Sequence, residues 1–488
     1  MTEPDYVVIG AGSSGCALVH RLSSDPSLRI LVLEAGVSGE ADPSVRSPGR
    51  WTSLLGSSYD WNYDTEPEPG LHGRRIRVPR GKAHGGSSAI NAMAYIRGSR
   101  VCYDRWRALG NTGWGYDDVL PLFERAEGVL AVSECRDPHA SHQAFLAAAT
   151  ELGFRSDPHH DFNGPAPEGV AGFYQKNFLN GRRHSAAAAF LMPALARPNV
   201  EIRSQAHATR LVLEGARVVG VEYLHERRLE RVCATRDVVL CAGAVDSPKL
   251  LMLSGIGAAD DLRALGIPVA ADLPGVGRNL QDHPKLSIRW RGTTTLPGST
   301  VTAGLFARTS SAAVADLQFY VGRGIEQPED VVTITVALVQ PRSKGSMALR
   351  SADPFSAPII RVNYLADSRD VDALVEGAAL ARRLGESHAY DHLRSEEIDP
   401  GLSIQDLAQF ARAQADTIYH PVGTCRMGPP SDREAVVDGQ LRVHGMNGLR
   451  VADASIMPEI VNAPTHAVCV MIGEMCARII SELREDHL

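Results

Sequence analysis

Three glycines near the start of the chain have the spacing that binds a dinucleotide. Gly10, Gly12 and Gly15 follow the apolar run 6–9 and open a helical run that extends to Leu22. The first glycine permits a tight turn, the second lets the backbone approach a pyrophosphate, and the third lets helix and strand pack closely. The start of the helix adds free N–H groups and the positive end of the helix dipole, both of which favour phosphate.

An acidic residue completes this pattern. The next apolar run, 30–33, ends at Glu34, 24 residues after Gly10, where a carboxylate can bond both ribose hydroxyls. An acid without a neighbouring Arg disfavours a 2′-phosphate. An ordinary βαβ turn is the alternative, but it does not require strand, glycines, helix, strand and acid in this order. The predicted ligand is an ADP-containing dinucleotide, FAD or NAD.

A second glycine-rich stretch, 79–98, identifies a family. It reads Pro-Arg-Gly-Lys-Ala-His-Gly-Gly-Ser-Ser-Ala-Ile-Asn-Ala-Met-Ala-Tyr-Ile-Arg-Gly and resembles the first signature of the glucose–methanol–choline (GMC) flavoprotein oxidoreductases. This resemblance implies FAD as the cofactor. It also implies FAD contacts from Gly81, Gly85, Gly86, Asn91, Ala92, Met93 and Ala94.

Two residues of this stretch depart from the family pattern. His84 stands where an aliphatic residue is usual, and two readings remain: a packing change or a hydrogen bond to the flavin edge. Ile90 stands where some members carry a histidine that links the flavin. We therefore expect FAD to be bound noncovalently.

Further signatures of the family follow in family order. The stretch 246–257 resembles the second GMC signature, and 273–283, 419–428 and 449–455 are also similar to family segments. The resemblance extends over nearly the whole chain. It adds to the predicted cofactor contacts the residues Ser14, Ala35, Ala208, Ala242, Asp453 and Ala454.

Two histidines match the catalytic positions of the family. His420 begins the motif His-Pro-Val-Gly-Thr, whose histidine lies at the reactive face of the flavin in the family. His466 falls at the second position, where choline-oxidising members usually have Asn and glucose- and aryl-alcohol-oxidising members have His. A neutral imidazole can accept the hydroxyl proton of an alcohol, and a second one can bond its oxygen. A structural alternative for His466 is a plain helix N-cap.

The fold class expected is α/β, with an FAD-binding Rossmann-like domain of the glutathione-reductase/GMC type and an α+β substrate domain containing an antiparallel sheet. The FAD-binding domain is predicted at 1–155, 193–285 and 418–488, and the substrate domain at 156–192 and 286–417. Runs at 200–203, 209–213 and 218–224 predict an antiparallel excursion from the first domain. Alternating runs at 331–336 and 359–362 predict the substrate sheet, and patterns at 370–384 and 403–413 predict helices.

Composition excludes several classes of function. In 488 residues, 44% are hydrophobic and 22% charged, as in ordinary globular proteins, and the net charge of −7 provides no basic field for nucleic acid. No run is long enough to span a membrane, and the glycine fingerprint starts too early to leave room for a signal peptide. The eight cysteines show no C-x-x-C spacing, so we expect neither disulfides nor a metal site, and a cytoplasmic protein.

Three functions are compatible with the resemblance. The leading one is FAD-dependent oxidation of a small alcohol by an oxidase or dehydrogenase, with O₂ or another electron acceptor as the second substrate. The second is a lyase like the hydroxynitrile lyases of the family, which keep FAD and both histidines without redox chemistry. The third is a flavin-binding protein without activity, which the presence of both histidines disfavours.

Overall fold

One half of the molecule is built around a five-stranded parallel sheet. The computed structural model describes residues 3–134, 138–293, 302–322, 330–401, 403–404 and 406–485. The strand order is β10-β2-β1-β14-β25. All neighbours are parallel, which agrees with the apolar, fully buried sequences of the central strands. The bounds are β1 Tyr6–Ile9, β2 Ile30–Glu34, β10 Val200–Ser204, β14 Asp237–Leu240 and β25 Leu449–Val451.

Two helices bring distant parts of the chain to the glycine loop of this sheet. Helix α1 (Ser13–Leu22) begins directly after Gly12, and α12 (Thr465–Glu485) packs along it. A Cβ on Gly473 of α12 would lie 2.2 Å from the carbonyl oxygen of Ser14, so this contact requires glycine. The close approach places the start of α12 beside the glycine loop.

The antiparallel excursion is present, with one correction. It comprises β11 (His207–Glu214), β12 (Arg217–His225) and β13 (Arg228–Cys233). The predicted strand 200–203 does not belong to it, because β10 pairs in parallel with β2 at the edge of the main sheet. The alternating sequence Val-Glu-Ile-Arg-Ser of β10 suits an antiparallel strand as well as the edge of a parallel sheet, and this is why the assignment was wrong.

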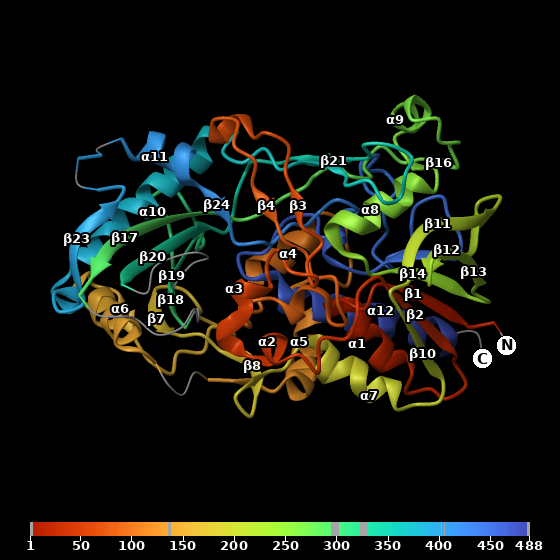
Figure 1. Cartoon of the computed structure of the whole chain (residues 1–488), viewed down its shortest axis with the longest axis horizontal. Coiled ribbons are helices and arrows are strands. Elements are labelled where there is room, and N and C mark those ends of the chain that lie inside the picture. The colour runs from red at the N-terminus through yellow and green to blue at the C-terminus, as the bar shows by residue number, and fades with distance from the viewer. Residues whose placement is uncertain are drawn as a thin grey trace.

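A large, mostly antiparallel sheet forms the other half of the molecule. Its order is β23-β17-β20-β19-β18-β7-β6, and β24 also pairs with β17. Figure 1 shows the two sheets at opposite ends of the long axis, with the large sheet at the left. The bounds are β6 Arg155–Ser156, β7 Val170–Phe173, β17 Pro284–Gly292, β18 Ala303–Ala307, β19 Leu317–Val321, β20 Val331–Leu338, β23 Arg394–Asp399 and β24 Asp416–Thr417.

Helices cover the large sheet. Helix α10 (Ser368–Glu386) packs on β20 and β17, and α6 (Ala140–Glu151) and α11 (Leu407–Gln414) lie against the same unit. The predicted helices at 370–384 and 403–413 correspond to α10 and α11. The predicted strand at 331–336 is part of β20, whereas the run 359–362 forms β22 (Ile359–Arg361), which pairs with β21 (Ser346–Ala348) in a sheet of its own.

The remaining elements are short or connect the two halves. The helices are α2 Pro43–Arg46, α3 Trp51–Leu54, α4 Arg100–Ala108, α5 Tyr116–Leu130, α7 Met192–Leu195, α8 Gly243–Leu253 and α9 Ala259–Ala264. The strands are β3 Tyr63–Asp64, β4 Arg77–Val78, β5 Val132–Ser133, β8 Lys176–Leu179, β9 Arg182–Arg183, β15 Ile256–Gly257 and β16 Ala271–Asp272. The single-turn segments are 48–50, 69–71, 86–89, 187–191, 388–390 and 454–456.

Two large hydrophobic cores divide most of the described chain, and a small third cluster lies around Val45, Leu54 and Ile90. The first surrounds the parallel sheet and α12, and the second lies between the large sheet and α10. Residues 144–149 of α6 lie in the second core and 186–191 in the first, each on the other side of the predicted domain boundaries. The boundaries themselves stay a proposal. None of the described helices combines the length and apolar character that crossing a bilayer requires.

Candidate active site

One cavity of about 540 Å³ collects residues from both halves of the molecule. Its lining includes the glycine loop, the end of β2, the stretch 79–94, the start of β11 and the loop after β14. The large sheet contributes residues of β17, β19, β20 and β23, and the C-terminal region contributes both predicted catalytic histidines. A dinucleotide site and the two histidines therefore share one space.

The glycines of the first loop occupy the positions that the sequence predicts for them. Gly10 has φ +101°, and a Cβ there would lie 2.5 Å from the carbonyl oxygen of Cys241. A Cβ on Gly15 would lie 2.1 Å from the carbonyl oxygen of Gly10, so α1 and the loop are in backbone contact. A Cβ on Gly12 would meet no protein atom closer than 3.8 Å, and Gly12 lines the cavity. The open side of Gly12 is thus the side from which a phosphate can approach.

The second glycine stretch packs backbone to backbone against the first. Gly86 has φ +52°, and a Cβ there would lie 2.8 Å from Cα of Gly12. Gly81 is equally constrained, since its Cβ would lie 2.2 Å from the carbonyl carbon of Gly86. The amide of Gly85 donates to the carbonyl oxygen of Ala11 at 2.7 Å. Together these glycines form a cradle without side chains, which suits a flat ligand with a pyrophosphate.

Most of the predicted cofactor residues line the cavity. These are Gly10, Gly12, Ser14, Glu34, Ala35, Gly81, Gly86, Asn91, Ala92, Met93, Ala94, Ala208, Ala242, Asp453 and Ala454. Gly15 and Gly85 do not, and their contacts show that they shape the loops behind the cavity wall. Asp453 holds the start of α8, because its Oδ2 accepts hydrogen bonds from the amide of Gly243 at 2.9 Å and from Oγ of Ser247 at 2.6 Å.

Glu34 is held by backbone amides at the edge of the cavity. Its Oε2 accepts from the amide of Ala11 at 2.8 Å and its Oε1 from the amide of Gly36 at 2.7 Å. Burial raises the pKa of the carboxyl to about 7, although both amide bonds oppose the shift. Each oxygen still has a lone pair available for a ribose hydroxyl.

At a pH above about 7, where the carboxyl is ionised, replacing Glu34 with Ala should weaken FAD binding by roughly 1.5–3 kcal/mol, because a hydrogen bond to a charged group is lost. The change also leaves the amides of Ala11 and Gly36 without their acceptor, so the apoprotein should become less stable. Titration of apoprotein with FAD measures the first effect and thermal unfolding the second. Unchanged FAD affinity would show that other contacts hold the adenosine end.

His84 lies outside the cavity lining, against the end of β10. Its Nε2 lies 2.8 Å from Oγ of Ser204 at the end of β10, and the residue does not line the cavity. Burial lowers the pKa of the imidazole, so the ring is a neutral partner of the serine. Its Nδ1 has no hydrogen-bond partner among the described residues, and its place outside the cavity lining favours the packing alternative.

The loop that carries His420 is built on a buried carboxyl group. The amide of His420 donates to Oδ1 of Asp282 at 2.7 Å, and the hydroxyls of Thr417 and Tyr364 each donate to Oδ2 at 2.5 Å. Tyr419 has φ +70°, a left-handed conformation that costs a residue with a large side chain of order 1–3 kcal/mol. The hydrogen bonds to Asp282 hold this strained turn, which presents His420 to the cavity.

A third histidine, which the sequence analysis missed as a functional residue, contacts the first. Nδ1 of His283 lies 3.0 Å from Nδ1 of His420, and the rings meet edge to face at 86°. Removal from water disfavours the charged form of an imidazole. Burial therefore lowers the pKa of His283 to about 3 and that of His420 well below its ordinary value. Two neutral rings joined by one hydrogen bond require one donor and one acceptor. The signal was the polar run 281–283 directly before a strand.

His466, the other predicted catalytic histidine, lies at the start of α12. It is the second residue of the helix, and its Nδ1 lies 2.9 Å from Oγ of Ser13 in the glycine loop. This contact does not cap the helix backbone, so the N-cap alternative has no support. Burial lowers the pKa of His466 to about 4, and Nε2 has no hydrogen-bond partner among the described residues. An unpaired polar atom in a cavity wall is available to a bound ligand.

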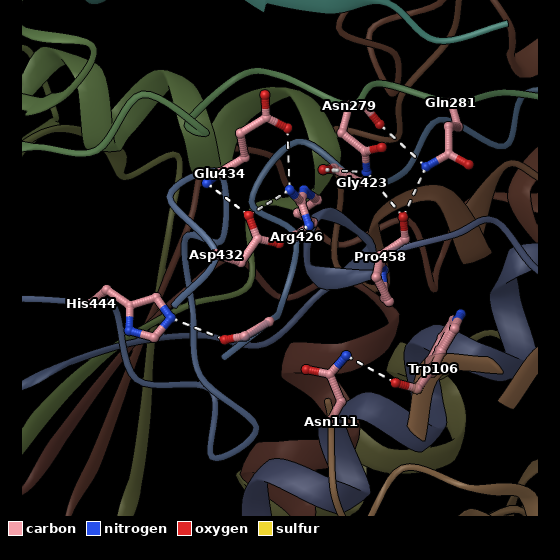
Figure 2. A network of polar contacts seen from close by, with 11 residues as sticks. Trp106, Asn111, Asn279, Gln281, Gly423, Arg426, Asp432, Glu434, His444 and Pro458 are labelled. Carbon is pink, nitrogen blue, oxygen red and sulfur yellow. Dashed lines mark hydrogen bonds and ion pairs between the residues drawn. The ribbon is translucent and has the colours of Figure 1, made fainter. Parts of the chain in front are cut away.

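The two segments that deliver these histidines are tied together behind the cavity. Figure 2 shows the contact: Nδ2 of Asn279 donates to the carbonyl oxygens of Gly423 at 3.2 Å and Pro458 at 3.1 Å. Nε2 of Gln281 donates to the carbonyl oxygen of Pro458 at 3.2 Å. Backbone bonds between Gln281 and Val422 complete the link. One short segment, 279–283, therefore fixes the loop of His420, the approach to His466 and the position of His283.

The chain is similar to proteins of known activity over nearly all of its length. Two family models described as GMC oxidoreductase match residues 4–285 and 341–473. Mitochondrial choline dehydrogenase of Mus musculus is 38% identical over 98% of this chain and 89% of that protein. Oxygen-dependent choline dehydrogenase of Sinorhizobium fredii is 37% identical over 97% of this chain and 95% of that protein. The crystal structure of pyridoxine 4-oxidase from Mesorbium loti has a TM-score of 0.91 at 31% identity, over 98% of this chain and 99% of that one.

These findings confirm the fold class, the cofactor FAD and an oxidoreductase that acts on CH–OH donors. The cavity fits that cofactor, because it joins a side-chain-free cradle, the carboxyl group of Glu34 at the end of β2 and an unpaired imidazole nitrogen. The chain belongs to the GMC oxidoreductase family.

Proposed function

We propose that this protein oxidises a small alcohol to an aldehyde or ketone, with His420 as the base for the hydroxyl proton and His466 as the hydrogen-bond partner of the same oxygen. The observation that carries the proposal is the cavity, which both histidines line together with the dinucleotide cradle. Both rings are neutral at physiological pH because burial lowers their pKa values. A neutral ring is the form that can accept a proton.

The partners of each ring support these roles. If Nδ1–H of His420 donates to Nδ1 of His283, Nε2 of His420 is left with a free lone pair for the alcohol proton. If the hydroxyl of Ser13 donates to Nδ1 of His466, Nε2 of that ring keeps its hydrogen and donates to the alcohol oxygen. Among the described contacts, His420 and His466 do not hydrogen-bond to each other. His283 holds the ring of His420, and Ser13 holds that of His466, so the two rings can act on the substrate separately.

When bound, FAD would supply the oxidant, as the acceptor for the hydride that leaves the alcohol carbon. The residues proposed to hold it are the lining glycines Gly10, Gly12, Gly81 and Gly86, with Glu34 at the ribose. The dipole of α12 directs its positive end toward the cavity, where it favours negative charge.

FAD should leave the protein intact when the chain is unfolded. Ile90 lines the cavity at the position where a linking histidine stands in some family members, and isoleucine has no nucleophile. Acid precipitation of the purified yellow protein is therefore expected to release all flavin into the supernatant. Colour that stays with the precipitate would refute noncovalent binding.

The comparisons favour redox chemistry. The relatives named above are dehydrogenases and an oxidase, and they give no support to a lyase of the hydroxynitrile type. Their names describe a small alcohol as substrate. O₂ or another acceptor completes the reaction in our proposal. The cytoplasmic location stays a prediction, because one relative is mitochondrial.

Anaerobic mixing with a panel of alcohols tests the proposed function. An oxidoreductase should lose its flavin absorbance with at least one alcohol and regain it when O₂ or a dye acceptor is added. A lyase or an inactive flavin protein would keep the oxidised spectrum with every alcohol of the panel, and that result would overturn the proposal.

A further inference from the structure

The wall of the cavity that faces the large sheet carries an unusual amount of charge. Strand β17 alternates, with Leu286 and Ile288 in the second core and Lys285, Ser287 and Arg289 on the cavity side. This is the two-residue period of a strand with one face on the core. Because β17 begins directly after the segment that fixes His283, its first side chain lies next to the catalytic end of the cavity.

Positive groups outnumber negative ones among the described residues of this wall. The cations are Arg74, Arg80, Lys285 and Arg289, and the carboxylates are Asp399 and Asp416. Lys285 pairs with Asp416 at 3.2 Å and Arg289 with Asp399 at 3.1 Å. We call these six side chains the charged wall.

Two arginines of the charged wall have only neutral acceptors. Nη2 of Arg80 donates to the carbonyl oxygen of Tyr419 at 2.5 Å, and Nη2 of Arg74 donates to that of Ala415 at 2.6 Å. Neither guanidinium forms an ion pair with a described carboxylate. The acid that acts most strongly on Arg80 is Asp282, whose oxygens are already bonded to Thr417, Tyr364 and the amide of His420. The cavity side of the wall is therefore left with positive charge.

The aromatic ring of Tyr419, next to His420, is already covered by a cation. Nζ of Lys285 lies 5.3 Å from the ring centroid of Tyr419. Burial lowers the pKa of Lys285, but Asp416 outweighs it and raises the pKa above its ordinary value, so the amine is charged. A quaternary ammonium group is recognised by free aromatic faces and carboxylates, and here a lysine covers the face. The wall opposes a cationic substrate.

We propose that the substrate is a small alcohol that carries an anionic group, and that Lys285 and the arginines of the charged wall bind that group while the hydroxyl meets His420. The inference rests on the proposed function. It also departs from choline, the substrate in the names of the relatives. Arginine and lysine are the side chains that bind carboxylate and phosphate in such sites.

Three primary alcohols of similar length test the charge preference: 3-hydroxypropanoate, 3,3-dimethylbutan-1-ol and choline carry a negative, a neutral and a positive group. The rate of flavin reduction per alcohol concentration, measured without air, should fall in this order, with at least about a hundredfold between the first and the last. Equal rates, or choline as the best of the three, would overturn the inference while leaving alcohol oxidation intact.

Variants locate the effect. Arg74→Gln, Lys285→Gln and Arg289→Gln should each reduce the preference for the anionic over the neutral alcohol by about 10- to 100-fold, the contribution of a charge-assisted hydrogen bond. Arg291→Gln is the matched control, since Arg291 lies on the same strand, is exposed, pairs with Glu396 and does not line the cavity. It should leave the preference unchanged. A preference that survives all three wall variants would place anion binding elsewhere and overturn the assignment.

A binding measurement separates this inference from the proposed function. Calorimetric titration of the holoenzyme should detect propanoate and not tetramethylammonium, whether or not any alcohol reduces the flavin. Propanoate binding that Lys285→Gln abolishes would support the charged wall even if the proposed oxidation failed. Binding of tetramethylammonium in preference to propanoate would contradict it.

Discussion

Replacing His420 with Ala is expected to slow flavin reduction by an alcohol about 10²–10⁴-fold, the usual contribution of a general base. The bonds that build the loop involve the backbone amide of His420 and the side chain of Asp282, and these survive the change. FAD content and thermal stability should therefore stay close to those of the wild type. Stopped-flow reduction without air, together with the FAD-to-protein ratio, measures both.

His466→Asn is the matched comparison for this variant. Asparagine can still donate a hydrogen bond to the alcohol oxygen, although it cannot accept a proton as a base. The rate should therefore fall less than in His420→Ala. If His466→Asn were the slower enzyme, the roles would be reversed, and His466 would be the base.

Replacing Gly12 with Val is expected to abolish FAD binding while the chain still folds. Gly12 has φ −77° and ψ −168°, an extended conformation that valine adopts readily, and its Cβ would meet no protein atom within 3.8 Å. The three added carbons would enter the cofactor side of the loop, where each overlap costs of order 1–3 kcal/mol. FAD affinity should drop by more than about a hundredfold.

The control for this variant is Gly128→Val on the exposed side of α5, where a Cβ would meet nothing within 4 Å. It should bind FAD as the wild type does. A yellow Gly12→Val protein with full flavin content would show that the pyrophosphate does not approach this loop. A Gly12→Val chain that fails to fold would show that the loop is less open than its contacts indicate.

The sequence predicted those parts of the site that depend on the conformation or close contacts of a single residue. A glycine that needs φ +101°, or whose Cβ would collide with backbone, leaves a mark in the sequence, and Gly10 and Gly15 were correctly placed for that reason. The end of β2 at an acidic residue, Glu34, could also be predicted from the sequence. His420 and His466 came from motifs of the family, because one histidine among 17 has no local mark of function.

The rest depends on contacts between distant segments. His283 is 137 residues from His420, and the rings come together through the backbone pairing of 281–283 with 418–422 and the bonds of Asp282 to the His420 loop. The pairing of β10 with β2 and the pairing of β22 with β21 are of the same kind, since a short strand fits several neighbours. The charged wall also could not be predicted from the sequence, because its six members come from four separate stretches of the chain.

The pH dependence of flavin reduction by an alcohol, measured in a single turnover without air, tests the central claim most directly. His420 must be neutral to accept the proton, and burial, His283 and Arg80 lower its pKa well below the ordinary value of 6.5. The rate should therefore stay constant from pH 6.5 upward and fall only at lower pH, as the ring becomes protonated. A rate that keeps rising about tenfold per pH unit between about pH 7 and 9 would contradict a buried, neutral histidine as the base.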